Sequence, residues 1–250
     1  QFCVCYVDDI LIYSNDQTEH LQHLKTVLQR LRENKMLVKK SKCIFGVNSV
    51  EFLGHTISSN GVAPLPSKIN AIAQFPRPTT IKKLQEFLGM VTFYHRFING
   101  IAKVLTPLSN LLKGKKKELE WTNEAEAAFK RAKTALADAT LLSYPSLTAV
   151  LRLTTDASDI AVGATLEQLE NGQPKPLGFF SKKLRPPETR YSTFDRELLA
   201  VHLAVKHFKH MLLGKTFEIM TDHLPLVHAF SKKTDPDSNR QQRQLSAIAE

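Results

Sequence analysis

The sequence has few cysteines, no long apolar run and no low-complexity tract. Its three cysteines, Cys3, Cys5 and Cys43, show no metal-ligand spacing, so we expect reduced, buried thiols in an intracellular protein. No apolar stretch approaches the roughly 18–20 residues of a membrane span, and no signal-peptide pattern is visible. We therefore expect neither a disulfide-stabilised secreted domain nor a membrane protein.

Acidic residues are also in short supply. The 250 residues include 34 Lys and Arg against 24 Asp and Glu, which gives a formal charge of +10. This balance favours a polyanionic partner such as nucleic acid, or an anionic membrane. Between Leu21 and Val47, seven basic residues accompany one acidic residue, Glu33. We interpret this segment as a surface that faces nucleic acid, although an ordinary solvated surface is the plain alternative.

Both ends of the sequence fall inside structured patterns. Gln1 opens an apolar, strand-like run, and Glu250 falls in the helical pattern RQLSAIAE. A chain of 250 residues is long enough for one large or two ordinary domains. We therefore expect it to be a piece of a longer polypeptide.

The first residues, QFCVCYVDDILIYSND, predict two strands joined by a two-residue turn, with Asp8 and Asp9 between the apolar runs. Such turns prefer Asn-Gly or Asp-Gly because both positions often need a positive φ. Two neighbouring aspartates fit that turn poorly and repel each other. We therefore favour a paired-carboxylate metal site, with a Mg²⁺-bound nucleotide triphosphate as substrate, over a plain turn.

Periodicity and turn residues divide the next part of the chain. An amphipathic helix is predicted at 18–34, followed by apolar runs with hairpin signals at Asn48-Ser49 and Asn60-Gly61. Prolines at 64, 66, 76 and 78 bracket a short helix and mark a boundary between units. Two apolar stripes predict helices across 81–112, and a basic loop, KGKKK, precedes a further helix that extends to residue 137.

After Tyr144-Pro145 the pattern changes to strands. VLRLTTD, IAVGATLEQ and PLGFFSKKL are predicted strands, the last two joined at Asn171-Gly172. A long helix is predicted at 193–213, with a cap at Ser192 and an end at Gly214. The strand FEIMTD and the short helix HLPLVHAF follow. Three strands, a helix, a strand and a helix indicate a mixed α/β unit.

Three carboxylates stand next to predicted apolar positions. Asp156 and Asp222 come at the ends of two strands, and Glu197 lies beside the apolar stripe of the long helix. Three converging carboxylates would repel each other unless a divalent cation neutralised them, which suits two-metal hydrolysis of a phosphodiester. The alternative is that the aspartates are strand-end turn residues and that Glu197 is a carboxylate near the helix N-terminus that the helix dipole favours.

With these residues in view, the whole chain resembles the pol polyprotein of gypsy-type long-terminal-repeat retrotransposons. Three blocks are similar to parts of reverse transcriptases: the palm box, the primer-gripping hairpin and the thumb block. They read YVDD at 6–9, EFLGH at 51–55 and FLGMVTFYHRFI at 87–98. Three further blocks look like successive ribonuclease H motifs: TDAS at 155–158, RELLA at 196–200 and TDH at 221–223.

The resemblance implies a fold of the α/β (α+β) class with a fixed domain order. Partial reverse-transcriptase palm hairpins and a helical thumb would precede a ribonuclease H-like mixed-sheet domain. Residues 1–63 would be the C-terminal part of the palm, and 64–118 the thumb and basic linker. Residues 119–250 would form the ribonuclease H-like domain, truncated at its C-terminus.

The resemblance also implies roles for the carboxylates. Asp8 and Asp9 would be two of three metal-binding carboxylates of the polymerase, the third lying upstream of residue 1. Asp156, Glu197 and Asp222 would be three of four ribonuclease H carboxylates, the fourth lying beyond residue 250. Each active site would hold two Mg²⁺ ions, with Mn²⁺ as an alternative. Because neither site would be complete, we expect this chain alone to extend no primer.

The partners implied are RNA–DNA hybrid and DNA, deoxynucleotide triphosphates in the full enzyme, and the protease and integrase of the polyprotein. The resemblance places the protein inside the cell, in a cytoplasmic virus-like particle, with a nuclear stage and the oligomeric state left open. A hybrid is recognised mainly through its backbone and 2′-hydroxyls, so basic side chains are the expected contacts. The candidates, each of which could instead be a solvated surface charge, are Lys39, Lys40, Lys42, Lys82, Lys83, Arg96, Lys115, Lys116 and Lys182.

Three hypotheses remain open at this point. The first is a fragment of a reverse transcriptase with ribonuclease H activity. The second is a non-catalytic nucleic-acid-binding remnant of a degraded or co-opted element, which the five retained carboxylates disfavour. The third is a polyprotein segment whose thumb and linker act mainly in subunit association.

Overall fold

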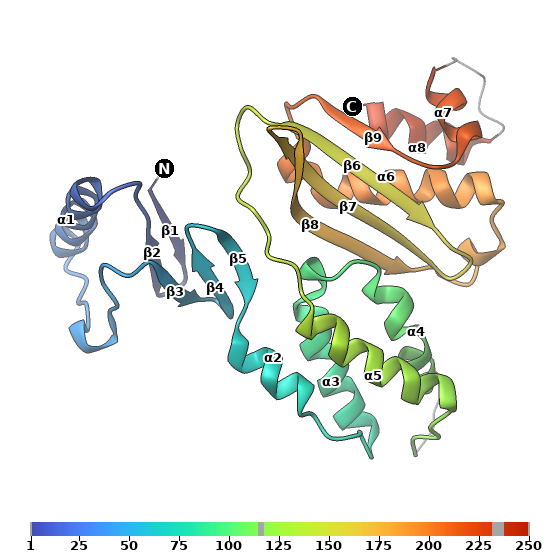
Figure 1. The fold of residues 1–250 in the computed structure, drawn as a ribbon, viewed down its shortest axis with the longest axis horizontal. Helices are drawn as coiled ribbons and strands as arrows, with labels where there is room; N and C mark the ends of the chain where they lie inside the picture. The colour runs from blue at the N-terminus through green and yellow to red at the C-terminus, as the bar shows by residue number, and fades with distance from the viewer. Residues whose placement is uncertain (1, 115–117, 232–237, 250) are drawn as a thin grey trace. The chain divides into compact units, whose positions relative to one another are not determined.

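A computed structural model describes residues 2–114, 118–231 and 238–249 (Figure 1). The chain divides into two compact units, Gln1–Ser59 and Asn60–Glu250. Both contain helices and strands, so the predicted mixed α/β class is confirmed. The predicted domain boundaries at 63/64 and 118/119 stay predictions.

The first unit is built from two short hairpins and one long helix. Its helix begins after Asp16, whose side chain accepts a hydrogen bond from the Glu19 N–H at 2.8 Å, as an N-cap should. No residue of this helix is buried. The elements of the unit are β1 (Cys3–Tyr6), β2 (Asp9–Ile12), α1 (Gln17–Glu33), the 3₁₀-helix η1 (Lys40–Lys42), β3 (Ser49–Phe52) and β4 (His55–Ser58).

Two turn predictions in this unit are wrong in detail. The first turn consists of Val7 and Asp8, because Tyr6 pairs with Asp9 and Asp9 begins β2. The hairpin between β3 and β4 turns at Leu53 and Gly54, both with positive φ, rather than at Asn48-Ser49. In both hairpins the cross-strand register, rather than the local residue preference, selects the two residues that turn.

The helical part of the second unit surrounds one hydrophobic core. The predicted stripes are its centre: Leu84, Phe87 and Val91 on one helix and Leu108 on the next are fully buried. Its elements are β5 (Gly61–Pro64), α2 (Pro66–Ala73), α3 (Ile81–Phe93), the 3₁₀-helix η2 (His95–Phe97), α4 (Ile101–Leu111) and α5 (Asn123–Ala137).

Helix α5 packs with the helices that precede it. Ala128, Phe129 and Leu136 of α5 belong to the same core as Phe87, and the Phe87 and Phe129 rings lie 4.6 Å apart. The chain leaving α5 then pairs with β5, where the Val62 N–H donates to the Leu142 carbonyl at 2.8 Å. The helix therefore belongs structurally to the helical part of the second unit.

The remaining residues form a four-stranded mixed sheet with helices. Its strand order is β8-β7-β6-β9, with β6 parallel to β9 and antiparallel to β7 (Figure 1). Asn171 and Gly172 both have positive φ in the β7–β8 turn, as predicted. The elements are β6 (Val150–Ala157), β7 (Ala161–Glu170), β8 (Gln173–Lys183), the 3₁₀-helix η3 (Glu188–Arg190), α6 (Thr193–Leu212), β9 (Phe217–Met220), α7 (Leu224–Ser231) and α8 (Asn239–Ala249).

Helix α6 covers one face of this sheet. Ala204, Phe208 and Leu212 of the helix pack against Leu151 and Leu153 of β6. The helix begins at its predicted cap, where the Asp195 N–H donates to the Ser192 hydroxyl, and ends before Gly214 with φ 73°. Since side chains alternate along a strand, Thr154 and Asp156 lie on the face away from α6.

Candidate active site

Glu197 on α6 is a buried carboxylate with unused acceptor capacity. The residue is only 4% exposed, and its Oε2 atom has no hydrogen-bond partner among the described residues. Burial, together with the negative charges of Asp156 and Asp222, raises the pKa of Glu197 to about 7, although the Ala157 N–H and Arg196 oppose this. The predicted orientation of Glu197 towards the sheet agrees with this burial.

Asp156 and Asp222 come from the same end of two neighbouring parallel strands. Thr154 of β6 pairs with Met220 of β9, and each aspartate follows its paired residue by two positions. Parallel strands lie about 4.8 Å apart, so this register brings the two carboxylates to one edge of the sheet. Both side chains are exposed, in contrast to Glu197. The strand register therefore brings Asp156 and Asp222 to one edge of the sheet, and the charges of both act on Glu197 of α6.

The chemistry of this set suits a divalent cation. Each carboxylate offers oxygen ligands of the kind that Mg²⁺ and Mn²⁺ prefer, and the unpartnered oxygen of Glu197 lies in a field of like charge. Within the described ranges, however, no three His, Cys, Asp or Glu side chains lie close enough together to bind one metal ion. The three residues thus fit a metal by type and charge, and no coordination geometry follows from their present positions.

Arg196 is a residue of this site that sequence reasoning missed. Its guanidinium binds the carboxylate of Asp159, which follows the first strand, and its charge lowers the pKa of Glu197. The link ties the first turn of α6 to the loop after β6. The sequence feature that indicates a role for Arg196 is its position directly before Glu197 in the block RELLA.

Asp8 and Asp9 lie in the first unit and are both exposed. Asp8 is in the turn and Asp9 is the first residue of β2. The turn residue before them, Val7, has φ 52°, a conformation that a β-branched residue rarely adopts. Backbone strain of this kind is found mainly where function requires a fixed conformation, which agrees with a functional turn.

The predicted nucleic-acid-binding residues occupy different environments. Lys83 forms an ion pair with Glu86 at 2.8 Å, and burial lowers the pKa of Arg96, whose guanidinium lies 5.5 Å from the centre of the Phe97 ring. Lys182 is half-buried on β8, and exposed side chains are found at Lys39, Lys40, Lys42 and Lys82. Lys115 and Lys116 lie outside the described residues.

Two family models match separate parts of this chain. Residues 1–57 match the family described as reverse transcriptase (RNA-dependent DNA polymerase). Residues 121–219 match the family described as an RNase H-like domain found in reverse transcriptase.

Among the described residues, no helix is long and apolar enough to cross a membrane.

Similar full-length proteins are polyproteins of a fission yeast. The transposon Tf2-3 and Tf2-7 polyproteins of Schizosaccharomyces pombe are each 35% identical to this chain over 240 residues, or 95% of its length. The chain spans only 18% of the length of these relatives.

Solved structures share the fold. The foamy viral protease-reverse transcriptase in complex with dsDNA has a TM-score of 0.84 at 23% identity, covering 99% of this chain and 52% of that chain. The same type of protein in complex with an RNA/DNA hybrid has a TM-score of 0.82 at 24% identity, covering 98% and 34%.

The chain therefore contains part of a reverse transcriptase and an RNase H-like domain of the kind found with it. Its membership of the gypsy-type long-terminal-repeat retrotransposon pol polyproteins, which the six sequence blocks predicted, is confirmed.

Proposed function

We propose that this chain is part of a retrotransposon enzyme that synthesises DNA on RNA or DNA templates and hydrolyses the RNA strand of RNA–DNA hybrids. Asp156, Glu197 and Asp222 are the proposed hydrolytic residues. The observation that carries this proposal is the buried, unpartnered oxygen of Glu197 in the field of two carboxylates from adjacent strand ends. Burial of an ionised carboxylate without a partner is costly, and a bound divalent cation would offset that cost.

Each residue of the site has a definable task. Two divalent ions, when bound, would activate a water molecule and stabilise the leaving oxygen. Asp156 and Asp222 offer exposed carboxylates from a rigid sheet edge, and Asp156 is the proposed ligand shared by both ions. Glu197 must lose its proton to become a ligand, and Arg196 favours that loss.

For DNA synthesis, we propose Asp8 and Asp9 as metal-binding carboxylates presented by the first hairpin. The third carboxylate and the residues that bind the incoming deoxynucleotide triphosphate would come from other parts of the polyprotein. The strained turn residue Val7 supports a fixed geometry at this position. RNA–DNA hybrid and DNA are the proposed substrates, and the protease and integrase of the same polyprotein are the proposed partners.

The test is a cleavage assay on an RNA–DNA hybrid with Mg²⁺ or Mn²⁺, using a polyprotein segment that includes this chain and extends through the fourth carboxylate. We expect Asp156→Asn to reduce hydrolysis by at least 10³-fold, an order of magnitude typical of losing a metal ligand at a catalytic centre. Asp138→Asn, which changes an exposed carboxylate at the end of α5, is the matched control.

Two outcomes of that assay would reject the proposal. Equal hydrolysis by the wild type and Asp156→Asn would show that these carboxylates are not the hydrolytic site. Hybrid binding by a wild-type segment without metal-dependent cleavage would favour the non-catalytic remnant. Hydrolysis that disappears on chelation and returns with Mg²⁺ supports the enzyme.

A further inference from the structure

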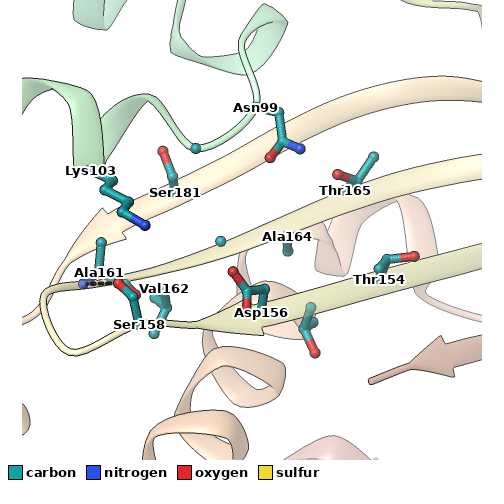
Figure 2. A pocket seen from close by; sticks show the side chains of 13 residues that line it. Asn99, Lys103, Thr154, Asp156, Ser158, Ala161, Val162, Ala164, Thr165 and Ser181 are labelled. Carbon is teal, nitrogen blue, oxygen red and sulfur yellow. Dashed lines mark hydrogen bonds between the residues drawn. The ribbon is translucent and has the colours of Figure 1, made fainter. Parts of the chain in front are cut away.

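A cavity of about 150 Å³ lies next to Asp156, between the sheet and the start of α4 (Figure 2). Its walls come from two parts of the chain that are distant in sequence. The helical part contributes Asn99 and Lys103, and the sheet contributes Thr154, Thr165 and Ser181. A water molecule takes about 30 Å³ in the liquid, so the space can accept a phosphate or a ribose rather than a single water.

Direct contacts hold α4 against the sheet. The Ala102 N–H donates to the Ser181 hydroxyl at 3.0 Å, and the Lys183 ammonium donates to the Asn110 side chain at 2.7 Å. These contacts lie near the two ends of α4. Leu105 and Leu108, on the turns of the helix between the two contacts, are buried. The position of Lys103 relative to Asp156 is therefore set by packing and hydrogen bonds.

Two polar side chains that line this cavity have unused hydrogen-bond donors. Neither Lys103 nor Asn99 has a side-chain hydrogen bond or ion pair among the described residues, and both are exposed. Figure 2 shows the Lys103 side chain extending from α4 towards the sheet, with the Asp156 carboxylate at the same cavity. The cavity thus combines a proposed metal ligand with an unpaired cation and an unpaired amide.

We infer that Lys103 and Asn99 bind the sugar–phosphate backbone of an RNA–DNA hybrid beside the bond that is hydrolysed. The inference rests on the proposed function, because it takes Asp156 as the group that faces the scissile phosphate. Lys103 supplies a positive charge for a neighbouring phosphate, and Asn99 supplies an amide that can bond a 2′-hydroxyl. The helical part of the unit, outside the RNase H-like match at 121–219, therefore contributes to substrate binding at the hydrolytic site.

Lys103 can be tested by the salt dependence of binding. The chain carrying Asp156→Asn, which prevents cleavage, is titrated onto a labelled RNA–DNA hybrid in the absence of divalent ions, and anisotropy is followed from 50 to 300 mM salt. Loss of one phosphate contact lowers the slope of log K against log salt by about 0.9–1. We expect this change for Lys103→Ala, with about tenfold weaker binding at low salt, and its reversal in Lys103→Arg.

Lys130→Ala is the matched control, because Lys130 is an exposed helical lysine on α5 whose loss changes the net charge equally. The slope should not change in this variant. An unchanged slope for Lys103→Ala, or an equal change for Lys130→Ala, overturns the inference. The melting temperature of each variant is measured alongside, and Lys103→Gln serves as a second neutral variant should the alanine variant unfold.

Asn99 is tested by comparing an RNA–DNA hybrid with a DNA duplex of the same sequence. We expect Asn99→Ala to weaken binding of the hybrid about 3–10-fold while binding of the duplex stays unchanged, because only the hybrid has 2′-hydroxyls. Equal weakening for both overturns the 2′-hydroxyl contact.

The cleavage assay then separates this inference from the proposed function. In the extended segment, Lys103→Ala should raise KM with kcat within about twofold, whereas Asp156→Asn should abolish kcat. If Asp156→Asn abolishes cleavage and Lys103→Ala leaves both constants unchanged, the inference fails and the proposed function stands. If Asp156→Asn has no effect, the proposed function fails.

Discussion

Arg240 of α8 binds Asp195 in the first turn of α6, with 2.8 Å between Nη2 and Oδ1. The same carboxylate oxygen accepts a hydrogen bond from the Gln241 side chain at 2.9 Å, and the Arg240 guanidinium lies 4.0 Å from the centre of the Tyr191 ring. The contact joins the last described helix to the turn of α6 that precedes Glu197. Position 195 is therefore an anchor for α8, two residues away from a proposed metal ligand.

The first prediction concerns this anchor. Burial raises the pKa of Asp195, but hydrogen bonds from Gln241, Arg240 and Ser192 outweigh this effect and hold the pKa below its usual value. The folded state therefore stabilises the ionised carboxylate relative to the protonated carboxyl group. Asp195→Asn and Arg240→Ala should each weaken the docking of α8, by about 1–3 kcal/mol for a hydrogen-bonded charged group. Faster amide hydrogen exchange in α8 is the measurement.

The stability that the Asp195–Arg240 contact contributes should depend on pH. A carboxyl group with a lowered folded pKa contributes stability above its unfolded pKa, and this contribution is lost as the pH falls through the folded pKa. Protection of α8 should therefore fall below about pH 4 in the wild type and change less in Asp195→Asn. Arg243→Ala, an exposed arginine on the same helix, is the control, and equal exchange in Arg243→Ala and Arg240→Ala would contradict the anchor.

The second prediction concerns Glu197 in the absence of divalent ions. Its folded pKa of about 7 lies above the ordinary value of 4.5, so the folded state binds the proton more tightly than the unfolded state. The contribution of Glu197 to stability is complete below pH 4.5 and is lost as the pH rises through 7. Glu197→Gln should remove this dependence and melt at a higher temperature than the wild type at pH 8.

Divalent ions should reverse the order of the two proteins at pH 8. Mg²⁺ binds the ionised carboxylates, so it should raise the melting temperature of the wild type and have little effect on Glu197→Gln. Thermal unfolding at pH 5 and pH 8, with EDTA and with Mg²⁺, measures all four cases. A wild-type melting temperature that responds neither to pH nor to Mg²⁺ would reject the role of Glu197.

The third prediction concerns Gly61 at the start of β5. Its φ is 137°, and a Cβ atom there would lie 2.2 Å from the Leu142 carbonyl oxygen. Leu142 is fully buried and pairs with Val62, so its backbone has little room to move. Gly61→Ala should lower the free energy of unfolding by about 2–4 kcal/mol through strain and overlap.

Gly89 provides the matched substitution. It is exposed within α3, and a Cβ atom there would meet nothing within 4 Å. Gly89→Ala should therefore stabilise the helix by about 0.5–1 kcal/mol, because alanine has the higher helix propensity. Calorimetry compares the two variants, with about 2–4 °C expected per kcal/mol in a protein of this size. A stable Gly61→Ala variant would show that the contact with Leu142 is not required.

Local signals in the sequence were sufficient for the elements that depend on near neighbours. Helix α6 begins at the Ser192 cap and ends before Gly214, as predicted. The β7–β8 turn uses Asn171-Gly172, because these residues tolerate positive φ without help from the rest of the fold. The same holds for the six sequence blocks, whose residue types and order were sufficient to identify the family.

Long-range pairing decided what those signals left open. Which two residues form the first turn depends on the pairing of Tyr6 with Asp9, whereas the positions of the apolar runs alone suggested Asp8 and Asp9. Helix α5 joined the helical core through the contact of Phe129 with Phe87, which are 42 positions apart in the chain.

By itself, then, the sequence determined which carboxylates this protein has and which helices and strands carry or adjoin them, since helix caps and apolar periods act over a few residues. Only the tertiary structure placed Asp156 and Asp222 at one sheet edge, through the pairing of Thr154 with Met220. It also buried Glu197 and raised its pKa, and it brought Lys103 to the cavity beside Asp156. These relationships depend on strand register and on packing between segments that are distant in sequence, which no local pattern specifies.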